Sequence, residues 1–318
     1  ILNKYFSNKK GSLEKLSNDS FLVIHFSDHI LTIAKISTNE SINSIEQLIN
    51  INIPTDIIGD FKVENKIELS NILQDVISLY ETNTTPIILL LSSTFFTIKS
   101  FNDGELVVFS ENNPELLSKS PFLPDNTLMQ HTRVSGNKIS SYHRVVYINK
   151  NVLDSWIEVL SKLENPIGGV TSSCIHLVEQ ITSKEGGLTI LCDIEFNSTV
   201  IYLEKSNCEF NSVKLPFGAS IYISEDENIG QQFLVRLDNA INKILEKYNY
   251  KSPKSIYLTG QGFDKLNTSS MNKFDKFKEF PIEIFNKYKL NKDIDKETIQ
   301  NNISNIIKLT SIAQIANK

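Results

Sequence analysis

The feature that most constrains the fold is an order of secondary structure that the sequence uses twice. In the first copy, apolar runs at Phe21–His25, Ile30–Ile36 and Gln47–Ile53 predict three strands. The segment Glu68–Tyr80 then places its apolar residues on one helical face. Ile87–Leu91 follows and is apolar throughout, which is typical of a strand buried on both faces.

The second copy has the same order of elements. Strands are predicted at Leu188–Asp193, Thr199–Leu203 and Glu209–Leu215, a helix at Gln231–Tyr248 and a central strand at Ser255–Leu258. Few residues are identical between the copies, so the repeat lies in the elements and not in the letters. A duplicated β-β-β-α-β order predicts an α/β protein of the ribonuclease-H-like type, with two sheets facing each other across a cleft.

The remaining segments fall around these two copies. Residues 92–150 contain strands at Thr94–Phe101 and Arg144–Ile148 and a proline-rich loop, which indicates a small α+β insertion. Helices are expected at Asn151–Leu163 and Ser172–Ile181. The expected organisation is a flexible arm at 1–19, a first lobe at 20–91 and 151–182, an inserted subdomain at 92–150, a second lobe at 183–298 and a closing helix at 299–318.

Composition narrows the class of protein. The chain has 318 residues, of which 40% are hydrophobic and 22% charged, as in ordinary soluble globular proteins. The net charge of −5 gives no reason to expect a nucleic-acid partner. The three cysteines have no metal-ligand spacing, and no apolar run approaches the roughly 20 residues that span a bilayer. We therefore expect a cytoplasmic protein.

The stretch Gly187–Leu203 is the first candidate site. Its leading strand ends in Asp193, and Asn197, Ser198 and Thr199 follow in a tight turn. Small hydrogen-bonding side chains and backbone N–H groups can cradle a phosphate, and the carboxylate can hold a hydrated Mg²⁺. A structural hairpin without a ligand is the alternative interpretation.

Three further patterns leave alternatives open. The loop Gly260-Gln261-Gly262 either approaches an adenine or ribose or forms a turn that needs positive φ. His25 and His29 flank a turn, where a metal or general-base role competes with a purely local one. Asp193 and Glu195 have the spacing of metal-binding carboxylates in ribonuclease-H-like nucleases, but Glu195 is also a plausible turn cap.

Six segments of the sequence follow one another in a characteristic order: Phe21–Ile36, Leu91–Phe96, Asn165–Gly168, Leu191–Thr199, Leu215–Gly218 and Leu258–Gly262. In this order they resemble the motifs of the actin-like ATPase superfamily. The resemblance is closest to the type IV pilus assembly protein PilM, with the division protein FtsA and the cytoplasmic domain of GspL as relatives. It covers nearly all of residues 20–315.

The resemblance implies an actin-like, two-lobed fold with a nucleotide in the cleft between the lobes. It also implies that the metal would lie at Asp193. The residues that match the family's cofactor-binding positions are Ser27, Asp28, Asp193, Asn197, Ser198, Thr199, Gly260, Gln261 and Gly262.

Three departures from the family motifs disfavour this chemistry. His25 stands where the family has an acid, and Ser27 stands where it has a glycine that approaches the phosphate closely. Glu195 replaces another glycine and directs a negative charge toward the phosphates. Two unit charges 4 Å apart repel by ~4 kcal/mol at a dielectric constant near 20, which corresponds to roughly three orders of magnitude in affinity. We expect no cofactor or weakly bound ATP with Mg²⁺, and hydrolysis is disfavoured.

The resemblance implies a scaffold of a type IV pilus or secretion machine that binds the cytoplasmic tail of an inner-membrane partner like PilN. The tail would occupy a groove between the first lobe and residues 92–150, and membrane association would be peripheral. One alternative is an active Mg²⁺–ATP-dependent ATPase or small-molecule kinase. Another is a self-associating filament like FtsA, but Ile299–Ala316 lacks the basic and aromatic flanks of a membrane anchor.

Overall fold

The computed structural model describes most of the chain from residue 20 onward. Within this part, no helix combines the length and the apolar character needed to span a membrane. The predicted arm at 1–19 and one of the three cysteines, Cys208, lie outside the described residues. The described ranges are 20–27, 30–38, 43–59, 62–80, 84–102, 113–135, 141–175, 177–178, 181, 187–205, 209–253, 255–266, 274–280, 288–291, 294, 298–299 and 303–316.

The first lobe contains a sheet in the order β10-β6-β1-β2-β3-β16. Its two central strands, β1 and β6, are parallel and apolar, whereas β2 and β3 pair antiparallel. One face is covered by the helices α1 and α3, with Trp156 fully buried between helix and sheet. The bounds are β1 Ser20–Ser27, β2 Ile30–Thr38, β3 Asn43–Asn52, β4 Ile58–Gly59, β5 Lys62–Val63, α1 Lys66–Leu79, β6 Ile87–Leu91, α3 Lys150–Leu160, β10 Ile167–Ser172 and β16 Tyr288–Leu290.

The second lobe contains a sheet in the order β13-β12-β11-β14-β15. The long helix α5 covers its outer face, and Phe233, Leu237 and Ile241 pack into the core beneath it. The bounds are β11 Leu188–Ile194, β12 Thr199–Lys205, β13 Phe210–Leu215, α5 Glu227–Lys247, β14 Ile256–Thr259, α6 Gln261–Asp264 and β15 Phe277–Glu279.

The two sheets share one topology, which confirms the predicted fold class. In each, three antiparallel strands are followed by a helix and then by a strand parallel to the first, giving β3-β2-β1-β6 and β13-β12-β11-β14. One segment differs from the expected organisation. Residues 288–290 were assigned to the second lobe, but β16 pairs with β3 through Tyr288 and Asn43. The chain therefore returns to the first sheet before its last helix.

The inserted subdomain is a three-stranded sheet in the order β7-β9-β8, with the short helix α2 on one face. Two of its strands were predicted. The strand β8 was missed, because its sequence TLMQHTRVS carries more polar than apolar residues. The bounds are β7 Phe96–Asn102, α2 Pro114–Leu117, β8 Thr127–Ser135 and β9 Ser141–Asn149.

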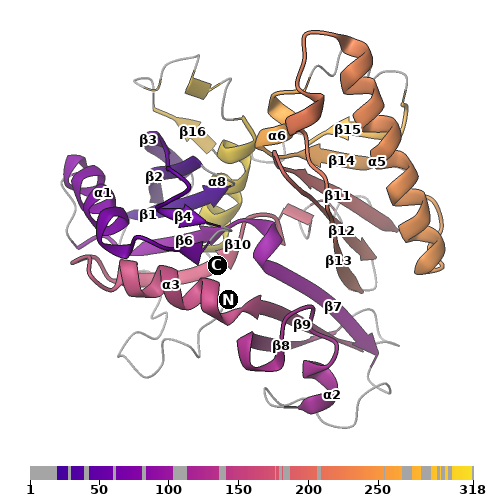
Figure 1. Ribbon diagram of the computed structural model, residues 1–318, viewed down its shortest axis with the longest axis horizontal. Coiled ribbons are helices and arrows are strands. Elements are labelled where there is room, and N and C mark those ends of the chain that lie inside the picture. The colour runs from indigo at the N-terminus through magenta and orange to yellow at the C-terminus, as the bar shows by residue number, and fades with distance from the viewer. Residues whose placement is uncertain are drawn as a thin grey trace.

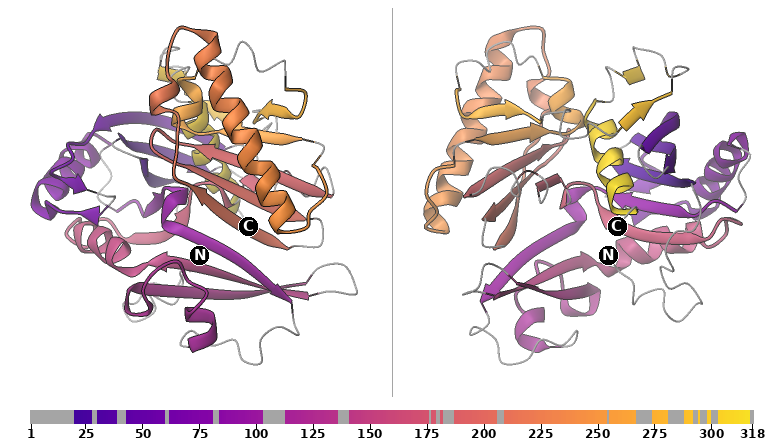
Figure 2. Two further views of the ribbon diagram at one scale, coloured as in Figure 1. Left: turned by 45° about the vertical axis from the view of Figure 1, so that its right-hand side comes forward. Right: turned by 180° about the vertical axis from the view of Figure 1, so that it is seen from behind.

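This subdomain is attached to the edge of the second sheet. The Ile98 amide donates to Ser212 Oγ at 2.9 Å, and the Phe210 amide donates to Ser100 Oγ at 2.7 Å. Arg144 Nη2 lies 3.2 Å from Glu204 Oε1, and the guanidinium stacks 4.6 Å from the centre of the Phe210 ring. The strand β7 therefore lies beside β13, as Figure 2 also shows.

The last helix, α8 (Ile303–Ala316), lies between the two sheets (Figures 1 and 2). Ile306, Leu309 and Ile312 pack on the face of the first sheet opposite α1. Ile307 belongs instead to a cluster with Leu191 of β11. The helix therefore contacts both lobes through different sides of its surface.

We expect Arg144→Ala to lower the free energy of unfolding by about 3 kcal/mol, because it removes the guanidinium that lies 3.2 Å from the buried Glu204 carboxylate. The matched control is Lys150→Ala, because the side chains of Lys150 and its partner Asp154 are 40% and 30% exposed, and loss of this ion pair should cost less than about 0.5 kcal/mol. Urea denaturation of both variants measures the difference. Equal, small losses for both would contradict the assigned role of Arg144.

Candidate functional site

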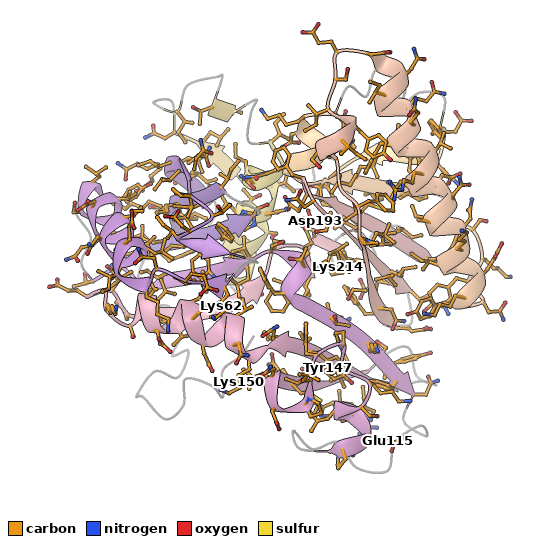
Figure 3. All side chains as sticks on the ribbon, viewed as in Figure 1. Lys62, Glu115, Tyr147, Lys150, Asp193 and Lys214 are labelled. Atoms are coloured by element: carbon orange, nitrogen blue, oxygen red, sulfur yellow. The ribbon has the colours of Figure 1, made fainter. Side chains whose placement is uncertain are left out.

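The candidate site lies where the ends of equivalent strands from the two sheets come together. Ser27 is the last residue of β1, and Asp193 lies one residue before the end of β11. Ser93 comes shortly after β6 and Ser173 directly after β10. Figure 3 shows Asp193 near the middle of the molecule, between the two sheets.

A lysine from α8 enters this place. Lys308 Nζ lies 2.8 Å from Asp193 Oδ1 and 2.7 Å from Glu195 Oε1. The side chains of Lys308 and Asp193 are completely buried, and that of Glu195 is 2% exposed. A charged group at such depth is stable only if it is paired and hydrogen-bonded. The three residues therefore form one buried ionic cluster, which we call the lysine cluster.

The charges in the lysine cluster stabilise one another. Burial alone would lower the pKa of Lys308, but the charges of Asp193 and Glu195 outweigh it and raise this pKa well above its usual range. Burial would likewise raise the pKa of Asp193, but the ammonium of Lys308 holds it below its usual value. Lys308 is therefore charged, and Asp193 is ionised beside it.

Serine hydroxyls form hydrogen bonds with the remaining oxygens of the two carboxylates. Ser93 Oγ donates to Asp193 Oδ2 at 2.6 Å, and Ser173 Oγ lies 3.4 Å from the same oxygen. Ser27 Oγ donates to Glu195 Oε2. This last bond crosses between the lobes, because Ser27 belongs to the first sheet and Glu195 follows a strand of the second. The serine at the family's glycine position thus has a defined partner.

His25 lies within β1 beside this cluster and is completely buried. Burial first, and then the charge of Lys308, lower its pKa to about 3. Among the described residues its ring nitrogens have no hydrogen-bond partner of ordinary geometry, although Asn305 lies close enough to favour the charged form slightly. His25 is therefore neutral and a weak base. The alternative role together with His29 has no further support, since His29 lies outside the described residues.

The turn after β11 packs against the glycine loops of its own lobe. The Glu195 amide donates to the carbonyl of Ser198 at 2.9 Å. A Cβ on Gly218 or Gly262 would lie 2.3 or 2.5 Å from the carbonyl oxygen of Glu195, and one on Gly260 would lie 2.1 Å from that of Ile194. These glycines are therefore needed for close packing of the loops on the turn.

The predicted site residues have different surroundings. Ser27 and Asp193 both belong to the network around Lys308, and Gly260, Gln261 and Gly262 lie against the turn. Thr199 Oγ1 donates to the Phe217 carbonyl at 2.9 Å, Ser198 is buried and Asn197 is exposed. Asp28 lies outside the described residues. Binding of nucleotide or metal by this set stays a prediction.

The sequence interpretation missed Lys308, although a signal was present. In the run Ile306-Ile307-Lys308-Leu309, one cation interrupts a segment expected to pack on a lobe. A lysine buried in this way requires an acidic partner. The sequence interpretation also missed Ser93 and Ser173 as hydrogen-bond partners of Asp193, because each is an ordinary polar residue after a strand.

Two neighbours of Lys308 attach the start of α8 to both lobes. Ser304 Oγ donates to Asp264 Oδ1 at 2.7 Å, and the Gly260 amide donates to Ser304 Oγ at 2.9 Å. Asn305 Nδ2 donates to Thr32 Oγ1 of β2 at 3.1 Å. Burial raises the pKa of Asp264 to about 6. The position of Lys308 therefore depends on contacts with the first lobe and with the second.

We expect Gly260→Ala to destabilise the protein by about 3 kcal/mol or more, because the backbone there has φ of 115° and the new Cβ would strike Ile194. Gly169→Ala is the matched control, since a Cβ there meets nothing within 4 Å. Thermal unfolding monitored by circular dichroism compares the two. A Gly260→Ala variant as stable as the control would show that the loop packs differently.

Comparisons with known proteins give the fold but no close relative. No protein-family model matches the chain, and no curated protein matches it. Among solved structures, the chain is similar to the PilM–PilN type IV pilus biogenesis complex, with a TM-score of 0.73 and 13% sequence identity. The match covers 94% of this chain and 98% of the other.

Two further solved structures match the same share of this chain. A Bacteroides thetaiotaomicron protein with an actin-like ATPase fold and unknown function gives a TM-score of 0.50 at 14% identity, covering 94% of this chain and 96% of the other. The cytoplasmic domain of EpsL, from the type II secretion system of Vibrio cholerae, gives 0.44 at 11% identity with the same coverage. The fold is assigned from the Bacteroides thetaiotaomicron protein and the PilM–PilN complex. The chain has the actin-like ATPase fold, as its sequence motifs predicted, and its structure is similar to PilM over nearly its whole length.

Proposed function

We propose that this chain is an actin-like scaffold that does not hydrolyse nucleotide and that binds the cytoplasmic tail of an inner-membrane partner in a type IV pilus or secretion machine. The lack of nucleotide hydrolysis is inferred from one observation, the ammonium of Lys308 between Asp193 and Glu195. In a nucleotide-binding member of this fold, Asp193 would be the ligand of the metal. Here Asp193 is already paired with a cation that the chain itself supplies.

The fit of Mg²⁺–ATP to these residues is poor. A metal at Asp193 would have to displace Lys308, and separating a buried ion pair costs about 3–5 kcal/mol. The Glu195 side chain also points into the interlobe region, where it would repel phosphates. The amide of Glu195 is already bonded to Ser198 and is not available to a phosphate.

One observation favours the alternative, an active ATPase or small-molecule kinase. Within the described part of the chain, Ser198 Oγ and Gln261 Oε1 are buried and make no hydrogen bond to the protein. Both belong to loops that match the family's nucleotide motifs, and a bound polar ligand would satisfy them. The alternative also needs a metal ligand and a base, for which His25 is poorly suited because burial keeps its pKa near 3.

Isothermal titration separates the two functions. We expect no heat of binding when the wild-type chain is titrated with Mg²⁺–ATP up to millimolar concentration, because Lys308 occupies the position of the cation. An active actin-like ATPase treated in parallel is the positive control. Micromolar binding by the wild type that disappears in Asp193→Asn would contradict the proposal and favour the alternative.

The partner is proposed from the similarity to PilM, whose solved structure is described as a complex with PilN. The candidate groove lies at the junction of the first lobe and the inserted subdomain. Leu128 and Val146 of the subdomain pack there against the core of the first lobe. Within the described residues β8 is an edge strand of this sheet, and such edges are where extended peptides add as a further strand.

Leu123 provides a test of this groove. It is 72% exposed and precedes β8, whose first residue, Thr127, pairs with the residue before α3. We expect Leu123→Asp to reduce recovery of a membrane-anchored partner by tenfold or more when the tagged chain is purified from detergent-solubilised host membranes. Leu79→Asp, on α1 and 66% exposed, is the matched control and should leave recovery unchanged.

Failure of the wild type to retain any membrane-anchored protein would argue against the tail-binding role. Loss of the partner with both variants would place the contact elsewhere on the surface.

A further inference from the structure

The lysine cluster and Ser27, which donates to Glu195, join three parts of the chain that are far apart in sequence. Asp193 and Glu195 come from the end of β11, Ser27 from β1 and Lys308 from α8. Lys308 and Glu195 are 113 positions apart in the sequence. Each of these side chains is at most 2% exposed. The cluster is therefore a buried connection between both lobes and the last helix.

The oxygen atoms around Lys308 Nζ are those that a hard metal cation prefers. Carboxylate oxygens of Asp193 and Glu195 lie 2.8 and 2.7 Å from the nitrogen, and serine hydroxyls bind the remaining carboxylate oxygens. Mg²⁺ and Mn²⁺ are bound by such oxygen ligands. The same donors would serve a metal ion if the ammonium were removed.

The charges of the lysine cluster would also be balanced better by a divalent cation than by the single charge of the ammonium. Two ionised carboxylates and one ammonium leave a formal charge of −1 in the cluster. His25 is neutral because burial lowers its pKa to about 3, and burial raises the pKa of the neighbouring Cys174 thiol well above its ordinary value, which keeps it neutral too. Neither residue supplies the missing positive charge. A divalent ion in place of the ammonium would neutralise both carboxylates.

We propose that Lys308 is a built-in substitute for the metal cation of this fold. By supplying this ammonium, α8 holds the two lobes together. This inference deepens the proposed function, since it names what replaces the bound metal. With α8 in place, the ammonium binds the second lobe while Ile306, Leu309 and Ile312 bind the first. Withdrawal of α8 would expose a divalent-cation site formed by Asp193, Glu195 and Ser27.

The helix is built to act as such a connector. Lys308 lies four residues after Ser304 and three after Asn305, so it is a neighbour of both on the surface of α8. Ser304 binds Asp264 of the second lobe, and Asn305 binds Thr32 of the first. A purely structural ion pair would share these contacts but would have no preference for metal ions once the lysine is removed. This difference makes the proposal testable.

The test is rescue of Lys308→Ala by a divalent cation. We expect this variant to melt well below the wild type, and 10 mM Mn²⁺ to raise its melting temperature by about 5 °C relative to NaCl of equal ionic strength. The wild type should not respond, because its cation is already present. The triple variant Lys308→Ala, Asp193→Asn, Glu195→Gln should lose the response, since it lacks the ligands.

A second variant keeps the test decisive if Lys308→Ala folds poorly. Lys308→Met retains the length of the side chain, so it should fold, melt below the wild type and gain nothing from Mn²⁺, because the thioether fills the position of the ion. If Lys308→Ala is insoluble, its refolding yield with and without Mn²⁺ replaces the melting temperature as the readout.

The proposal is overturned if Lys308→Ala shows no specific response to Mn²⁺, or if the triple variant responds equally. Either result would leave the titration with Mg²⁺–ATP unaffected, because that experiment uses the wild-type chain. Conversely, nucleotide binding by the wild type would overturn the proposed function without any Lys308 variant. The two failures are therefore distinguishable.

Discussion

One buried ammonium lies between two buried carboxylates and pairs with both, and the arrangement of the molecule depends on this interaction. Asp193 and Glu195 cannot remain charged between the lobes without Lys308, because an unpaired buried charge costs several kcal/mol. Lys308 in turn can reach them if α8 lies between the sheets, where apolar residues hold it against the first lobe. The relation between the two lobes is thus linked to the place of the last helix.

The departures from the family motifs explain one another in the structure. Glu195 introduces a charge into the interlobe region, Lys308 pairs with it, and the hydroxyl of Ser27 donates to its second oxygen. His25 then lies beside a cation, where a neutral imidazole is better tolerated than a charged one. Taken one by one, these substitutions would only weaken a nucleotide site. In the structure, Ser27 and Glu195 join Lys308 and Asp193 in one buried polar network between the lobes.

The sequence predicted those parts of the fold whose residues show a clear period or an unbroken apolar run. The helices α1, α3 and α5 and the strands β6 and β14 were predicted in this way. The strand β16 was missed because its three residues are too few to show a period, and its pairing with β3 joins residues 245 positions apart, Tyr288 and Asn43. For the site, Asp193 was identified from its local turn. Its partner Lys308 was not, because no local pattern records which acid a distant lysine will meet.

The most direct test of this account is an experimental structure of the wild-type chain crystallised with Mg²⁺ and a non-hydrolysable ATP analogue. The account predicts Lys308 Nζ within hydrogen-bonding distance of both Asp193 and Glu195, with α8 between the sheets and no metal at Asp193. A metal–nucleotide complex bound at Asp193, with Lys308 turned away, would contradict it.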